Sequence, residues 1–166
     1  LTNINIRIRE GKKVKIKNIH FVGNKRLSTE DLRDQMETQA ATWLSWLDES
    51  GIYKKDILKL DMLRLEGYYQ NHGFIRARVL EHEIKINKRK KAIHIVVSVE
   101  EGPQYKVGAI EVQSDDTLTE AEIRKAMKTK RNRVYNVSQV REDVLSIADL
   151  YSRQGHAYAD VSPKTK

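Results

Sequence analysis

An internal repeat constrains the fold of this chain more than any other feature of its sequence. The dipeptide Glu10-Gly11 recurs as Glu101-Gly102, 91 residues later, and the same offset relates the alternating apolar residues that follow. An offset of 82 then relates Tyr53–Gly73 to Tyr135–Gly155, which places an insertion of nine residues within Gln39–Gly51. A sequence repeated in this order is expected to fold as copies of one small unit.

The repeat divides the 166 residues into three parts. Residues 1–11 match the end of a unit, so we predict that they form the last strand of a preceding copy. Residues 12–102 form one complete unit. Residues 103–166 form a second unit that lacks a counterpart to Ala92–Glu100, so we predict that it is truncated before its last strand. The chain is therefore expected to be part of a longer array.

Periodicity predicts the element order β-α-α-β-β in each unit. Apolar residues alternate from Val14 to Phe21 with one slip in phase after Ile16, which indicates a strand with a β-bulge. Ser28–Asp31 and Thr119–Glu122 resemble capping boxes, each expected to start a short helix. The next helix carries an apolar stripe, and a glycine ends it; the stripe and glycine are Leu58, Met62, Leu65, Tyr69 and Gly73 in the first copy, and Val140, Val144, Ile147, Tyr151 and Gly155 in the second.

Two strands are expected after the glycine, at about Ile75–Ile86 and Ala92–Glu100. The second is an almost continuous run of β-branched residues, which is typical of a strand buried between neighbours. The predicted fold class is α+β, with a small three-stranded mixed sheet in each unit, covered on one face by two helices.

Several classes of function are disfavoured by the composition and by missing motifs. The absence of cysteine rules out disulfide scaffolds, thiolate zinc sites and cysteine nucleophiles. The five histidines lack ligand spacing, so neither a metal site nor another cofactor is expected. No phosphate loop or catalytic triad is present, which indicates that the protein is not an enzyme. No apolar run approaches the roughly 18 residues of a transmembrane helix.

The order of these features resembles the POTRA (polypeptide-transport-associated) family. The resemblance rests on Val14–Asn24, Leu27-Ser28, Tyr68-Tyr69, Gly73-Phe74 and Val99–Gly102, and a second copy begins at Pro103. The second copy departs from the pattern, because Ser114-Asp115 replaces Gly23-Asn24 and His156 replaces Phe74. The tandem arrangement resembles the periplasmic part of bacterial outer-membrane β-barrel assembly proteins.

This resemblance implies a function and a location. It implies a non-enzymatic, chaperone-like scaffold on the periplasmic side of the outer membrane, within a full-length outer-membrane protein. The expected partners are unfolded outer-membrane β-barrel proteins and accessory lipoproteins, with substrates passed to a C-terminal membrane barrel that this chain lacks; no nucleic-acid partner is expected. The family's strand order, first-third-second, would leave the second strand at an edge of the sheet.

An exposed edge strand suggests a way to bind many different β-strands. Its unpaired backbone groups can pair with an added strand whatever the side chains of that strand are. The candidate site residues are Arg78, Val79, Leu80, Glu81, His82, Glu83 and Ile84. Alternatively, the charges on this edge serve only to prevent aggregation.

Three further segments are candidate contact sites. The insertion carries Trp43, Leu44, Trp46 and Leu47, which either dock a partner or fold back as additional core. The predicted hairpin turn carries Lys88, Arg89, Lys90 and Lys91, and a second basic loop carries Lys128, Lys130, Arg131 and Arg133. Each basic segment either contacts an anionic partner or is a solvated turn.

Two alternative functions stay open at this point. The chain could be the POTRA region of a related secretion or translocation pore. The net charge of +8 and the small αβ units also suggest an RNA-binding array. KH domains share a β-α-α-β core, but they need a GxxG loop between their helices, and neither copy has one.

Overall fold

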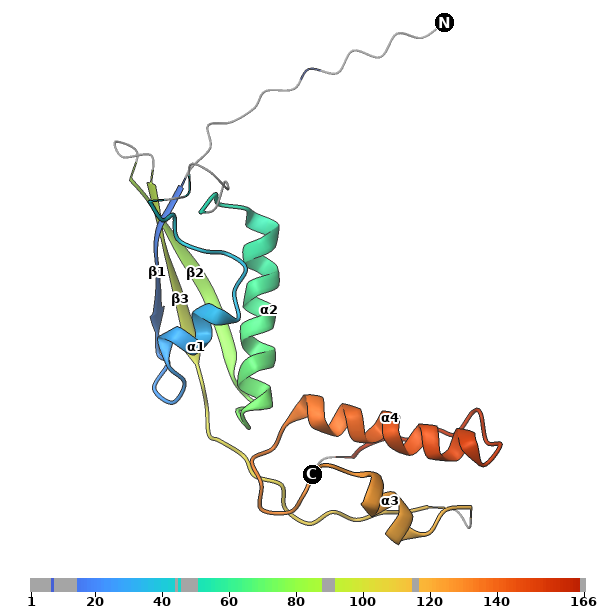
Figure 1. The fold of residues 1–166 in the computed structure, drawn as a ribbon. Helices are drawn as coiled ribbons and strands as arrows, with labels where there is room; N and C mark the ends of the chain where they lie inside the picture. Colours follow the sequence, from blue (N-terminus) through green and yellow to red (C-terminus); the bar gives the residue numbers. More distant parts are fainter. Residues whose placement is uncertain are drawn as a thin grey trace, which may run out of the picture.

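The computed structural model describes residues 7, 15–43, 45, 51–87, 92–114 and 117–164. The elements are, in chain order, β1 (Lys15–Val22), α1 (Thr29–Asp34), α2 (Lys55–Asn71), β2 (Arg78–Asn87), β3 (Ala92–Glu100), α3 (Glu120–Ala126) and α4 (Val137–Arg153). The first five follow the predicted β-α-α-β-β order. Figure 1 shows these five together, with α3 and α4 beyond the C-terminal end of α2.

The sheet has the strand order β1-β3-β2, with β3 parallel to β1 and antiparallel to β2. The prediction that the last strand occupies the centre is confirmed. The register between β1 and β3 shifts between Ile16 and Asn18, where the slip in phase predicted a bulge. β2 begins at Arg78, later than the predicted Ile75, because the Ala77 N–H donates to the Phe74 carbonyl (2.9 Å) and closes a turn there.

The main core lies between the sheet and its two helices. Most of the predicted apolar positions on β1, α2 and β3 are buried, and Ile16, Leu58, Leu65, Tyr69, Ile95 and Val97 are fully so, whereas Phe21 and Met62 are partly buried. Met36 is buried as well, although α1 ends before it, at Asp34. Gly73 and Gly155 take positive φ angles of 85° and 91°, as the predicted helix ends require.

The second copy keeps its helices but not its predicted strands. Residues 105–112 and 157–161 do not form strands, although the repeat predicts strands there. None of the described residues of this copy pairs with these segments as β3 pairs with both of its neighbours in the first copy. The remaining core is correspondingly small, and its buried residues are Leu118, Ile123, Ile147 and Tyr151.

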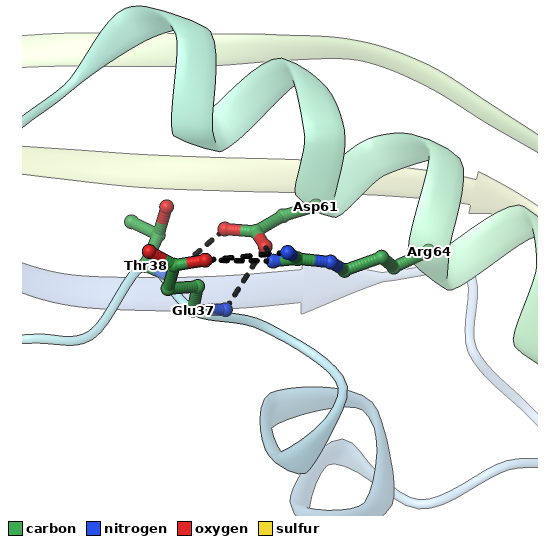
Figure 2. A network of polar contacts seen from close by, with 4 residues as sticks. All are labelled: Glu37, Thr38, Asp61 and Arg64. Carbon is green, nitrogen blue, oxygen red and sulfur yellow. Dashed lines mark hydrogen bonds and ion pairs between the residues drawn. The ribbon is translucent and has the colours of Figure 1, made fainter.

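A buried aspartate connects the long helix to the segment before it in both copies. The Asp61 carboxylate is fully buried and accepts the N–H groups of Glu37 (2.9 Å) and Thr38 (2.8 Å), as Figure 2 shows. Arg64 donates to the same carboxylate at 2.7 Å and also contacts Glu37 at 3.2 Å. The pKa of Arg64 is raised, chiefly by its hydrogen bond to Asp61.

The second copy repeats this arrangement without the arginine. Asp143 is buried and accepts the N–H groups of Lys128 (2.6 Å) and Thr129 (2.9 Å). In both copies the carboxylate satisfies two backbone donors that no secondary structure pairs, which holds the preceding segment against the helix.

The end of α2 forms the junction between the two copies. The Tyr105 N–H donates to the Gly73 carbonyl (2.8 Å), and the side chain of Gln104 donates to the His72 carbonyl (2.9 Å). A Cβ atom on Gly73 would lie 2.7 Å from the Tyr105 carbonyl oxygen, whereas Gly155 has no neighbour within 4 Å of the same position. Only a glycine therefore permits this approach of the two backbones.

A second buried carboxylate, Glu101, anchors the end of β3. It accepts the N–H of Arg26 (3.0 Å) and the hydroxyl of Tyr69 (3.2 Å). Burial raises the pKa of Tyr69 well above its ordinary range, and the neighbouring charge of Glu101 adds to the effect. The phenol therefore stays protonated in the folded chain at pH values where an exposed tyrosine ionises.

Replacing the buried aspartate should destabilise the first copy. Asp61→Ala leaves the N–H groups of Glu37 and Thr38 without their charged acceptor, and Thr38 is buried, so we expect the free energy of unfolding to fall by about 2–4 kcal/mol in urea denaturation. Asp149→Ala is the control, since it removes only an exposed ion pair to Arg153, and its effect should stay below about 0.5 kcal/mol. Equal losses for the two variants would contradict the role assigned to Asp61.

Tyr69 should also make stability depend on pH in the alkaline range. Above about pH 10 the unfolded chain loses the phenolic proton that the folded chain retains, so the folded state is increasingly disfavoured as pH rises. We expect an additional loss of about 1.4 kcal/mol per pH unit in the wild type compared with Tyr69→Phe. Urea denaturation at a series of pH values measures this difference, and parallel slopes for the two proteins would refute it.

Candidate functional site: the open edge of the sheet

The outer edge of β1 is closed by other parts of the chain. The Ile16 N–H donates to the Gly51 carbonyl (2.7 Å), and the Ile16 carbonyl accepts the N–H of Ala41 (2.7 Å). Further along, the guanidinium of Arg33 donates to the Ile19 carbonyl (3.0 Å). A strand approaching β1 would find these backbone groups already paired.

The second copy closes its first segment in the same way. Val107 pairs through its N–H with the Arg133 carbonyl and through its carbonyl with the Asn132 N–H, both at 2.8 Å. Arg124 donates to the Ile110 carbonyl at 2.7 Å. The closure of this edge is therefore a property of the repeated unit.

The outer edge of β2 is different. β2 is the last strand of the sheet, and nothing in the described part of the chain pairs with its outer side as a strand. At its first outward position, the Val79 N–H donates to Oε1 of Glu66 on α2 (3.0 Å). The register with β3 shifts between Val79 and His82, so β2 contains a bulge of its own.

The side chains of β2 fall into two groups. Val79 and Ile84 are half-buried and pack against the core. Arg78, Leu80, Glu83, Lys85 and Ile86 are exposed, and Lys85 pairs with Glu83 at 3.2 Å. This ion pair contributes little to stability, because both side chains are more than half exposed. Glu81 and His82 lie in β2, but their side chains are outside the described structure.

The structure covers only part of the other candidate sites. Trp43 is 82% exposed, so of the two alternatives for the insertion, additional core does not hold for this residue. Leu44, Trp46, Leu47 and the basic turn Lys88–Lys91 lie outside the described residues.

Two lysines of the second basic loop have partners within the protein. Lys128 pairs with Glu142 (3.0 Å), and the ammonium of Lys130 donates to the Met127 carbonyl (2.9 Å) after the end of α3. This second contact is typical of a cation that stabilises the C-terminal end of a helix.

Sequence reasoning missed the polar residues that shape the unit. Asp61 and Asp143 are related by the offset of 82, and Arg33 and Arg124 by the offset of 91. Comparing polar as well as apolar residues at these offsets would have identified both pairs. Glu66 gave no such signal, because the corresponding residue of the second copy is Ala148.

The described ranges hold no group of three or more histidine, aspartate or glutamate side chains placed to bind a metal ion. Within the same ranges, every helix is too short or too polar to cross a bilayer.

A sheet with the order β1-β3-β2, covered on one face by two helices and followed by the helix pair of a second copy of the sequence repeat, defines the class of this protein. The POTRA family model, described as a surface antigen variable number repeat, matches residues 14–102 and 105–166. The chain belongs to the POTRA family, as its sequence pattern suggested.

Its relatives are outer-membrane protein assembly factors. The chain is 30% identical over 162 residues to BamA of Neisseria meningitidis and 27% identical over 165 residues to BamA of Nitratidesulfovibrio vulgaris. These alignments cover 96% and 97% of the chain, but only 20% and 21% of the two relatives. The chain thus spans about a fifth of their length.

Solved structures confirm the fold. The POTRA3-5 region of Haemophilus influenzae BamA matches with a TM-score of 0.70 at 20% identity, covering 92% of this chain and 60% of that one. BamA of Haemophilus ducreyi lacking POTRA domains 1-3 matches with a TM-score of 0.61 at 16% identity, covering 81% of this chain and 24% of that one. The predicted likeness to the POTRA region of outer-membrane β-barrel assembly proteins is therefore confirmed.

Proposed function

We propose that this chain is a periplasmic, non-enzymatic part of an outer-membrane assembly factor, and that it binds unfolded outer-membrane β-barrel proteins by pairing their strands with β2. The observation that carries this proposal is the contrast between the two edges of the sheet. Internal contacts close the edge of β1, whereas β2 ends the sheet. The names of the BamA relatives support outer-membrane assembly over a secretion pore, and POTRA membership argues against RNA binding.

The register indicates which backbone groups of β2 point outward. Val79 pairs with Val99 but gives its N–H to Glu66, so this N–H is not directed at β3. Along an antiparallel pair of strands, residue pairs that exchange hydrogen bonds alternate with pairs that do not. Because β3 itself has no bulge, Val97, Ile95 and Ile93 belong to the same kind of pair as Val99, which exchanges no hydrogen bond with β2. Their partners on β2 are His82, Ile84 and Ile86. These three residues would offer the N–H and C=O groups for an added strand.

The surroundings of this edge suit an amphipathic strand. Glu66 marks the side of α2 that faces β2, and Leu63 lies one turn earlier on that side with 64% of its surface exposed. Leu80 and Ile86 are 45% and 63% exposed. Backbone pairing would supply affinity without a sequence requirement, and these apolar side chains would contact the apolar face of a barrel strand.

A separate surface is proposed for accessory lipoproteins. Trp43 is the described residue of the insertion that exposes a large apolar side chain. Tryptophan is common among the residues that dominate protein interfaces.

The division of the chain into domains also remains a proposal. Residues 1–11 are proposed to be the end strand of a preceding domain, residues 12–102 a complete domain, and residues 103–166 a domain truncated before its last strand.

Strand addition predicts that one outward N–H of β2 matters more than the side chain that accompanies it. Ile86→Pro removes an N–H that does not pair with β3, so the fold should persist while a strand peptide loses one hydrogen bond. We expect NMR titration with a peptide from an outer-membrane β-barrel strand to show binding weakened roughly fivefold.

Ile86→Ala is the matched control, because it removes the same side chain but keeps the N–H. It should retain most of the affinity, and single-stranded RNA should shift no amide signal in either variant. Equal weakening by both substitutions would show that the side chain, and not the backbone, carries the binding.

Trp43→Ala should separate docking from folding. Because the ring is exposed, we expect the free energy of unfolding to change by less than about 0.5 kcal/mol, while binding to an accessory lipoprotein weakens. Thermal denaturation and a binding titration measure the two effects. A large loss of stability with unchanged binding would overturn this assignment.

A further inference from the structure

We propose that Glu66 ends the strand-binding edge by occupying the Val79 N–H, and so fixes where along β2 an incoming strand stops. This inference rests on the proposed function and adds a positioning residue to it. Its basis is the 3.0 Å hydrogen bond from the Val79 N–H to Oε1 of Glu66.

The bond occupies the first outward-facing donor of β2. β2 begins at Arg78, and the outward positions inferred from the register are Val79, His82, Ile84 and Ile86. At Val79 the donor is already used by a carboxylate, whose charge-assisted hydrogen bond is stronger than the amide–carbonyl bond an added strand would offer. An incoming strand therefore gains nothing by displacing Glu66, and its pairing ends before Val79.

The position of Glu66 makes this stop a built feature of the fold. Glu66 lies in the interior of α2, a helix of 17 residues that packs on the sheet and contacts β2. In Figure 1, α2 lies beside the lower part of β2, where the strand begins. The helix thus places the Glu66 carboxylate at the Val79 end of β2, away from the outward positions His82, Ile84 and Ile86.

The bulge between Val79 and His82 separates the occupied donor from the others. A bulge bends its strand and increases the local twist, so a strand that paired beyond it would have to follow that bend. Glu66 and the bulge therefore limit pairing at the same place. A bound strand has a defined end, although its sequence is not read.

The test is amide hydrogen exchange of the whole chain with and without the barrel-strand peptide, at two peptide lengths. In the wild type, the peptide should slow exchange at His82, Ile84 and Ile86, and leave Val79 unchanged. Extending the peptide by two residues at the end that reaches Val79 should not alter its affinity. In Glu66→Ala, Val79 should gain peptide-dependent protection, and a peptide extended at the end that reaches Val79 should bind about fivefold more tightly than the short one.

Glu66→Gln is the matched control, because its side-chain carbonyl can still accept the Val79 N–H but without the negative charge. Its bond is no stronger than the one an added strand offers, so Val79 should gain partial peptide-dependent protection, less than in Glu66→Ala. A purely structural role for Glu66 would lower stability without making affinity depend on peptide length. Peptide-dependent protection of Val79 in the wild type, or the absence of any length dependence in Glu66→Ala, would overturn this inference alone. If the peptide protects no residue of β2 in any variant, the inference and the proposed function are both overturned.

Discussion

The pairing of β3 with strands on both of its sides is the interaction on which the rest of the structure depends. β3 satisfies backbone groups of β1 and β2 and buries Ile95 and Val97 beneath the helices. The second copy shows what this pairing contributes. Its two helices and its capping box form, whereas residues 105–112 and 157–161 are not strands, and none of its described residues pairs with them as β3 pairs with β1 and β2.

The sequence predicted the elements well, because the signals that define them are local or periodic. The alternation in β1, the stripe on α2 and the β-branched run of β3 each reflect one buried face, and the repeat showed them twice. The insertion was less predictable, because an exposed Trp43 and a buried one give the same sequence pattern. The start of β2 was misplaced for a similar reason, since the turn at Phe74–Ala77 is closed by a backbone bond that composition does not reveal.

The candidate site was predictable only as an edge. Strand order placed β2 outermost, but the residues that set the limits of the edge act through single side-chain contacts. Arg33 reaches the Ile19 carbonyl from α1, and Glu66 reaches the Val79 N–H from α2. Such contacts depend on how a helix lies over the sheet, which no pattern within either segment reports. The two residues have complementary roles, since a guanidinium satisfies an acceptor on one edge and a carboxylate satisfies a donor on the other.

The contact at Gly73 restricts how the second copy is oriented relative to β2. Rotation of the second copy about the connection at Gly102 and Pro103 would break the bond from Tyr105 to Gly73 and move Arg76 away from the Tyr105 ring, whose centroid is 5.8 Å from the guanidinium carbon. These two contacts therefore oppose rotation between the copies, and they fix the direction of β2 relative to the second copy. If β2 binds a polypeptide as proposed, that polypeptide would leave β2 in a fixed direction relative to the second copy.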